Sequence, residues 1–168
     1  MTECSTSRRV CQAGADYVRP FLQESPRRIA IISCEGACVK GEVARVAANL
    51  VCYRHARDRT VRICLGDALT ASSGFDQLVS QAPRVVAIEG CALRCGSRML
   101  QQRFPAIEAE TLVATRSYTY DEAMFEIFDM PPEETMLHAQ AVASTALQFI
   151  KDEEGQSEKP GCETACSA

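Results

Sequence analysis

Short apolar segments alternate with segments of helical periodicity along most of this chain, and this alternation is the feature that most constrains its fold. The first pair is the isoleucine-rich run RIAIISC, residues 28–34, followed by apolar residues at helical spacing up to about Arg57. A short, nearly continuous apolar run is typical of a strand buried on both faces. Strands that alternate with helices form crossover units, so the pattern predicts a mostly parallel sheet with helices on both faces.

The same alternation continues to residue 151. Further strands are predicted over TVRICLG (60–66), RVVAIEG (84–90) and ETLVATRS (110–117), and further helices over 74–81, 92–103 and 133–151. We therefore predict an α/β fold: a single-domain, three-layer (Rossmann-like) arrangement of about four strands, formed by residues 28–151. Residues 1–27 are predicted to be irregular apart from one short helix around 15–23, and residues 152–168, which lose all periodicity, to form a flexible tail.

Composition and charge narrow the classes of partner and location. A chain of 168 residues with 46 % hydrophobic residues can bury a core, and it contains no apolar run of the roughly 20 residues that a membrane helix needs. The net charge of -4 gives no electrostatic reason to expect nucleic acid or an anionic membrane as a partner. The N-terminal segment has no apolar core of a signal peptide, so we expect a reducing, cytoplasmic location.

Ten of the residues are cysteine, and their positions relative to the predicted strands are informative. Cys34, Cys64 and Cys91 each lie at or next to the carboxyl end of a different predicted strand. The carboxyl ends of parallel strands meet at one edge of a sheet, which is where such folds place their sites. Cys95 follows Cys91 by four residues, one helical turn, and Cys38 stands in the same relation to Cys34.

Four thiolates at one edge of a sheet are the donor set of a tetrahedral Zn²⁺ site. We therefore predict a zinc site formed by Cys34, Cys64, Cys91 and Cys95, with Cys38 as a fifth candidate ligand. Helices that begin near these residues would offset part of the negative charge, because the amino end of a helix favours anions and thiolates.

Three ordered motifs carry a family resemblance. The segments CEGACVKGEVARVAANL, ICLGDAL and AIEGCALRCG resemble, in this order, the motifs of the DGC-domain family, which is regarded as zinc-binding, and the resemblance covers about residues 28–150. It implies that Cys34, Cys64, Cys91 and Cys95 are the chelating residues. Two positions depart from the family pattern: Glu89 stands where the family has aspartate, and Cys38 stands where a small polar residue is usual.

Other chemistry is compatible with the same thiols. A cysteine at a helix amino end, such as Cys34 or Cys91, could attack a disulfide, with the cysteine four residues later resolving the product, which would make the protein a thiol-dependent redox enzyme. Four thiolates also suit an iron–sulfur cluster, or a soft ion such as arsenite or mercury. A phosphatase-like site is not supported, because the arginine expected six positions after the cysteine is Lys40 after Cys34 and Ser97 after Cys91.

Several further residues have both a functional and a structural interpretation. Glu35 and Glu89 flank the candidate cysteines, where a carboxylate could serve as a base or weak ligand, or simply as a polar residue at a strand end. Cys162 and Cys166 form a separate pair in the tail, either a metal or redox shuttle or a pair without a dedicated role. The remaining candidates are Cys52, for which we predict packing in the core; His55 and His138, either metal ligands or solvated side chains; and Cys4 and Cys11, for which no role is predicted.

Overall fold

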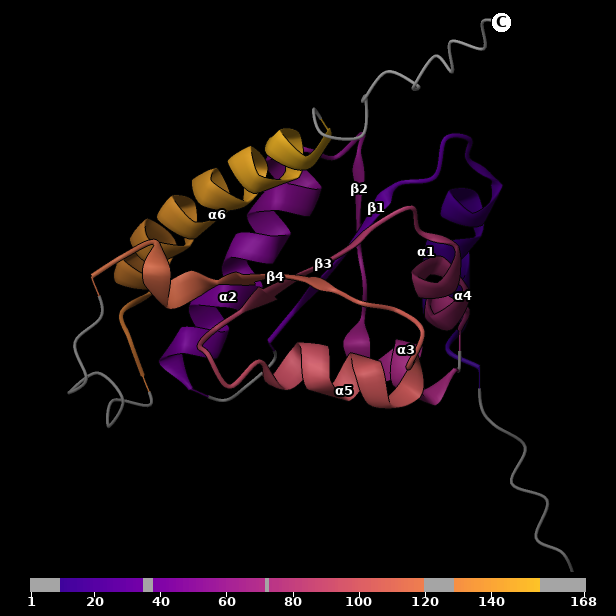
Figure 1. Ribbon diagram of the computed structural model, residues 1–168, viewed down its shortest axis with the longest axis horizontal. Coiled ribbons are helices and arrows are strands. Elements are labelled where there is room, and N and C mark those ends of the chain that lie inside the picture. The colour runs from indigo at the N-terminus through magenta and orange to yellow at the C-terminus, as the bar shows by residue number, and fades with distance from the viewer. Residues whose placement is uncertain (1–9, 35–37, 72, 120–128, 155–168) are drawn as a thin grey trace, which may run out of the picture.

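The protein is built on one four-stranded, all-parallel sheet with the strand order β2-β1-β3-β4 (Figure 1). The strands are β1 (Ile29–Ser33), β2 (Thr60–Arg62), β3 (Val85–Glu89) and β4 (Glu110–Val113). This computed structural model describes residues 10–34, 38–71, 73–119 and 129–154, with side chains up to residue 151. The predicted α/β fold with a parallel sheet of four strands is confirmed.

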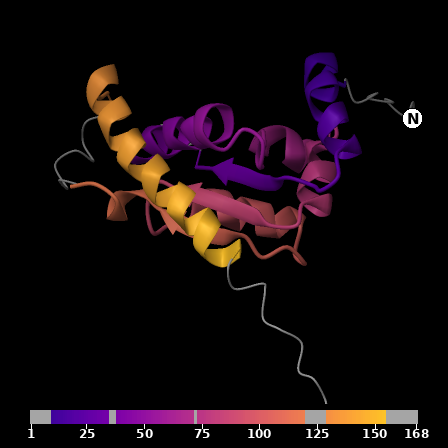
Figure 2. The ribbon, with the colours of Figure 1, turned by 90° about the horizontal axis from the view of Figure 1, so that it is seen from above.

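Helices cover both faces of the sheet, because side chains that alternate along each strand point to opposite faces. Ile29 and Ile31 of β1 pack with α2 (Val39–Leu50) and α6 (Pro132–Glu154). Ala30 and Ile32 pack on the other face with α1 (Gln12–Gln23), α3 (Leu65–Thr70), α4 (Phe75–Gln81) and α5 (Cys95–Arg103). In both views, α6 and α1 lie at opposite sides of the molecule (Figure 1, Figure 2).

Several boundaries differ from the sequence prediction, and the differences lie mostly at the carboxyl ends of the strands. β2 ends at Arg62 instead of residue 66, because the short helix α3, which was not predicted, begins at Leu65. β4 ends at Val113 and continues as a 3₁₀ turn, Ala114–Arg116. α5 begins at Cys95 instead of residue 92, because Arg94 adopts a left-handed conformation with φ +52°.

The boundaries of the first two helices also differ from the prediction. α1 begins at Gln12, three residues before the predicted start, and its Val18 is buried in the core. α2 begins at Val39 and ends at Leu50, where a π-helical turn, Val51–His55, continues it. Within the described ranges, we find no helix with the length and apolar character needed to cross a membrane.

Candidate functional site

Three neighbouring strands are each followed by a cysteine at the same edge of the sheet. Cys34 comes directly after β1, Cys64 two residues after β2 and Cys91 two residues after β3. β1 and β3 end within one residue of each other, since Ser33 is in register with Ile88, whereas β2 ends at Arg62 opposite Ile31, two residues before the end of β1. Because β1 lies between β2 and β3, Cys34 follows the central strand of the three.

Two further cysteines stand at helix starts on this edge. Cys38 immediately precedes α2, and Cys95 is the first residue of α5. Cys34 is buried, Cys38 and Cys91 are half-buried, and Cys64 and Cys95 are exposed. All seven cysteines in the described ranges are free thiols.

Two glycines allow the cysteine-bearing segments to pack closely. A Cβ atom at Gly90 would lie 2.8 Å from the backbone of Lys40 and Gly41, so only glycine fits between β3 and the first turn of α2. A Cβ at Gly96 would lie 3.4 Å from the Ser33 carbonyl oxygen, which places the start of α5 beside the end of β1. The segment around Cys91 therefore lies against that around Cys38, and the start of α5 at Cys95 lies against the segment around Cys34.

The sulfur atoms themselves do not form a coordination group. Among the residues that the structure describes, no three Cys, His, Asp or Glu side chains come close enough together to hold one metal ion. The fold thus gathers the backbone positions of the candidate cysteines at one edge without arranging their side chains around a common centre. Glu35, a candidate base or weak ligand, lies outside the described residues, as do Cys4, Cys162 and Cys166.

Glu89, the last residue of β3, caps helix α5 with its side chain. The residue is only 1 % exposed, and its two carboxylate oxygens accept hydrogen bonds from the backbone N–H of Gly96 (3.2 Å) and of Ser97 (2.5 Å). The Ser97 hydroxyl donates a third hydrogen bond at 2.7 Å. A carboxylate at the amino end of a helix satisfies backbone donors that have no partner within the helix. Glu89 thereby fixes the position of α5 and of Cys95 at its start.

Arg62, the last residue of β2, is a buried cation on the other side of β1. Its side chain donates to the Ile63 carbonyl oxygen (2.8 Å), to the Ser33 hydroxyl (2.6 Å) and to the Asn49 side-chain oxygen (3.2 Å). These contacts tie the carboxyl ends of β1 and β2 to α2. They also place a permanently charged guanidinium next to Ser33, the residue that precedes Cys34.

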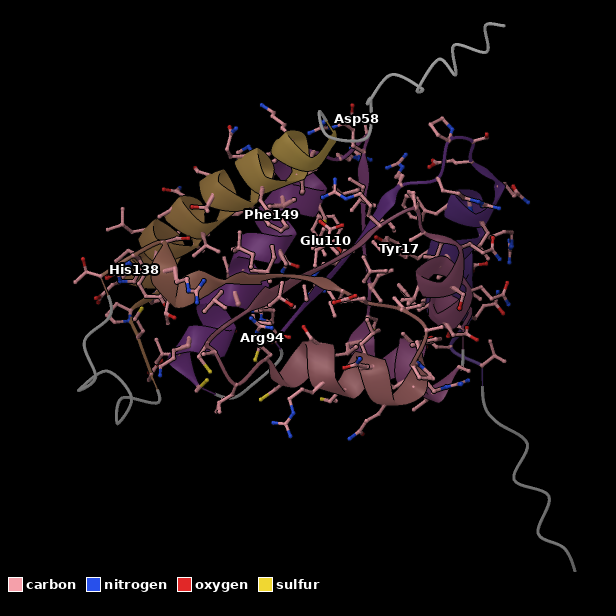
Figure 3. The ribbon with its side chains drawn as sticks, in the orientation of Figure 1. Tyr17, Asp58, Arg94, Glu110, His138 and Phe149 are labelled. Atoms are coloured by element: carbon pink, nitrogen blue, oxygen red, sulfur yellow. The ribbon has the colours of Figure 1, made fainter. Side chains whose placement is uncertain are left out.

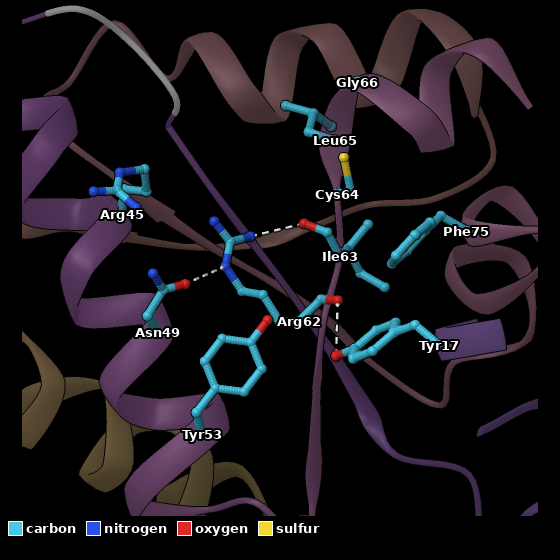
Figure 4. Close-up of a pocket in the computed structure, with 10 residues that line it drawn as sticks. All are labelled: Tyr17, Arg45, Asn49, Tyr53, Arg62, Ile63, Cys64, Leu65, Gly66 and Phe75. Carbon is cyan, nitrogen blue, oxygen red and sulfur yellow. Dashed lines mark hydrogen bonds between the residues drawn. The ribbon is translucent and has the colours of Figure 1, made fainter. Parts of the chain in front are cut away.

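Cys64 occupies a different environment from the other candidate cysteines. Its side chain lines a pocket of about 450 Å³ that opens beside β2, together with residues from α1, α2 and α4 (Figure 4). Arg62 lines the same pocket. Neither this pocket nor the burial of Arg62 was predicted from the sequence.

The remaining candidate residues lie apart from the cysteines at the edge of the sheet. Cys52 is 3 % exposed within the core against α6, which confirms its predicted packing role, and burial raises the pKa of its thiol to about 11. His138 stacks on Tyr118 with ring centroids 4.6 Å apart. It lies near the start of α6, away from Arg94 in the turn that precedes α5 (Figure 3). His55 and Cys11 are exposed.

Comparisons with known proteins agree with the motifs. Residues 30–142, more than half of the chain, match the DGC domain. A search of curated proteins and a search of solved structures each gave no match. The match spans all four strands and the five candidate cysteines, and the chain therefore belongs to the DGC-domain family.

Proposed function

We propose that this protein binds a zinc ion through cysteine thiolates at the carboxyl edge of its sheet, in a structural or metal-handling role. The proposed ligands are Cys34, Cys64, Cys91 and Cys95, with Cys38 as a fifth candidate. The observation that carries the proposal is the strand order, which makes β2, β1 and β3 direct neighbours. Neighbouring strands lie about 4.8 Å apart. The thiols after three consecutive strands are therefore close enough that small movements of their loops could bring the sulfur atoms to one metal ion.

The donor chemistry of these residues fits zinc. Thiolates are soft ligands, and four of them in a tetrahedron form the most common kind of structural Zn²⁺ site, with bonds of about 2.3 Å. Bound zinc would crosslink loops that follow three different strands. Since the described sulfur atoms do not already form a group, we expect metal binding to be coupled to local ordering of these loops.

The charges around the edge also suit a bound cation held by thiolates. Four thiolates around Zn²⁺ carry a net charge of about -2, and the guanidinium of Arg62, hydrogen-bonded to Ser33, offsets part of it. Glu89 adds a buried carboxylate beside the start of α5. That carboxylate attracts the Zn²⁺ ion itself and repels a lone thiolate at Cys95, but it adds to the net negative charge of a four-thiolate site.

The same contacts weaken the interpretation of Cys95 as the reactive thiol of a redox enzyme. Such an enzyme would use the amino end of a helix to stabilise a reactive thiolate. At α5, the first backbone N–H groups already donate to Glu89. The feature that would activate Cys95 is therefore occupied by a carboxylate.

The proposal names five candidate cysteines for a site that needs four ligands, and experiment can show which four bind zinc. Cys38 lies beside the Gly90 segment, in the part of the edge that also holds Cys91, whereas the side chain of Cys64 lines the pocket beside β2. Zinc content should be compared for Cys38→Ser and Cys64→Ser, because the variant that keeps zinc identifies the thiol that is not required.

The central experiment is elemental analysis of the full chain purified anaerobically without added metal. We expect about one zinc per chain in the wild type and a large loss in Cys91→Ser. Cys52→Ser is the matched control, since it removes a thiol from the core and should keep its zinc. A zinc content near zero with all thiols titratable would refute the proposal, and a brown protein absorbing near 400 nm would indicate an iron–sulfur cluster in its place.

We further propose a reducing, cytoplasmic location, in which these thiols stay available for metal.

A further inference from the structure

The pocket beside β2 has the size and lining of a small-molecule site. Its volume of about 450 Å³ falls within the roughly 300–1,000 Å³ that is usual for ligand pockets. It is bounded by residues from α1, α2, α4 and the segment after β2, so that four separate parts of the chain converge on it (Figure 4).

One wall of the pocket is polar and belongs to a single helical face. Arg45, Asn49 and Tyr53 follow one another at intervals of four residues along α2 and its π-helical continuation, which places them on one face. The side-chain oxygen of Asn49 accepts a hydrogen bond from Arg62 at 3.2 Å. Figure 4 shows the amide nitrogen of Asn49 turned away from Arg62, where it is a hydrogen-bond donor.

The opposite wall is apolar and flat. Tyr17 of α1 stacks on Phe75 of α4, with ring centroids 5.6 Å apart and an interplanar angle of 23°. Leu65 continues this wall next to Cys64. Burial raises the pKa of Tyr17, so that its hydroxyl stays protonated, and this hydroxyl donates to the Arg62 carbonyl oxygen at 3.4 Å.

The charge that the lining residues carry is positive. Arg45 and Arg62 both line the pocket, and none of its described lining residues is acidic. Glu42, outside the lining, already accepts paired hydrogen bonds from the Arg45 guanidinium at 2.6 and 2.8 Å and offsets part of its charge, so a ligand carboxylate would share this guanidinium with Glu42. Guanidinium groups recognise carboxylates through paired hydrogen bonds, and their charge remains at every physiological pH.

We propose that this pocket binds a small carboxylic acid with a flat apolar body. The carboxylate lies on the side of Arg45, Asn49 and Tyr53, and the apolar body lies against the Tyr17–Phe75 wall. A bound acid would also lie beside the thiol of Cys64. Cys64 is also a proposed zinc ligand, so the pocket and the proposed metal site share this residue.

The test is an NMR titration of the ¹⁵N-labelled full chain, kept reduced and with the metal that it carries on purification, with phenylacetate as the probe. We expect saturable shifts of the backbone amide signals of residues 62–66 between about 0.1 and 10 mM. Phenylacetamide, which has the same shape without the charge, and acetate, which has the charge without the ring, should each bind at least about tenfold more weakly. Absence of saturable shifts with phenylacetate would overturn the proposal, as would equal binding of phenylacetamide.

Variants localise the contact. Arg45→Gln should weaken phenylacetate binding about tenfold, whereas Arg98→Gln, which removes an exposed charge on α5 outside the pocket, should leave it unchanged. Equal weakening by both variants would show a general charge effect and overturn the proposal. Tyr53→Phe, at a half-exposed residue that removes only a hydroxyl, is a second test that does not rely on the folding of the Arg45 variant. It should weaken binding several-fold, and unchanged binding in both pocket variants would refute the site.

Discussion

Two buried charged residues end the strands on either side of β1, and they have opposite signs. Glu89 ends β3 and is 1 % exposed, and Arg62 ends β2 and is 8 % exposed. The carboxylate accepts hydrogen bonds from the first turn of α5, whereas the guanidinium donates to carbonyl, hydroxyl and amide oxygens around β1 and β2. Each charge is therefore held by partners of complementary polarity, as buried charges require.

The comparison divides the carboxyl edge of the sheet into two halves with different chemistry. The half around Glu89 holds Cys91 and Cys95, whereas the half around Arg62 holds the pocket proposed for an anion together with Cys64, which the proposed zinc site would share. Cys34, after the central strand, lies between them. The following predictions test whether the two halves behave independently.

Removal of zinc should have the largest effect, because the proposed ligands follow three neighbouring strands, on both sides of β1. At free zinc about 1,000 times its dissociation constant, binding to the folded state alone contributes about 4 kcal/mol to the free energy of unfolding. A chelator should therefore lower the thermal midpoint markedly, in the wild type and in Cys52→Ser alike. An unchanged midpoint after zinc has been stripped, with the loss of metal checked by elemental analysis, would contradict a role for the ion in holding this edge together.

Glu89→Ala should be the most damaging single substitution among the charged residues at this edge. It removes three hydrogen bonds and leaves the buried N–H of Gly96 without its partner, so we expect the free energy of unfolding to fall by about 3 kcal/mol. Urea unfolding of the metal-free protein measures this loss. Glu89→Asp keeps the charge on a shorter side chain and should lose less, whereas equal losses for Ala and Asp would show that the reach of the carboxylate, and not its charge, supports α5.

Cys52 lies in the core and serves as the control for the cysteines at the edge of the sheet. Burial raises its pKa from 9.0 to about 11, while the Thr60 hydroxyl and the Arg62 charge act weakly in the opposite direction. As the pH rises, the thiol ionises in the unfolded chain before it ionises in the folded protein. Its contribution to the free energy of unfolding is therefore complete below about pH 9 and is lost as the pH rises towards 11. The wild type should therefore lose about 2 kcal/mol more than Cys52→Ala between these pH values, measured by urea unfolding. Parallel pH profiles for the two proteins would contradict this assignment.

The sheet and the edge that carries the cysteines were predictable because both depend on local patterns. Apolar runs such as RIAIISC identify buried strands, and the position of a cysteine at the end of each run follows directly. The short helix α3 was missed, because only Ile63 and Cys64 separate it from β2 and neither is a turn residue. The predicted strand 60–66 was consequently too long.

The burial of Arg62 and the pocket depend on contacts between distant parts of the chain. An arginine in a strand is normally exposed, and only the approach of Asn49 and Ser33 makes its burial favourable here. The polar face of Arg45, Asn49 and Tyr53 was not predicted, and the aromatic wall opposite it comes from α1 and α4, which are distant in the sequence. The positions of the sulfur atoms could not be predicted from spacing, because they depend on side-chain rotamers and not on the register of the strands.

The smallest expected effect is the loss of folding stability in Arg45→Gln. Because this loss is small, the variant can test ligand binding without unfolding the protein. Arg45 pairs with Glu42 three residues earlier, and both side chains are more than a third exposed, so the pair should stabilise the fold by about 0.5 kcal/mol or less. The hydrogen bond from Arg45 lowers the pKa of Glu42 below 4.5, so this contribution is present above that pH and is lost as the pH falls through the lowered value. Urea unfolding of Arg45→Gln should match the wild type at low pH and differ only slightly at pH 7. If the fold is intact, weaker phenylacetate binding by Arg45→Gln can be attributed to the missing guanidinium. If the free energy of unfolding instead falls by about 2 kcal/mol, Arg45 supports the fold, and Tyr53→Phe becomes the decisive variant.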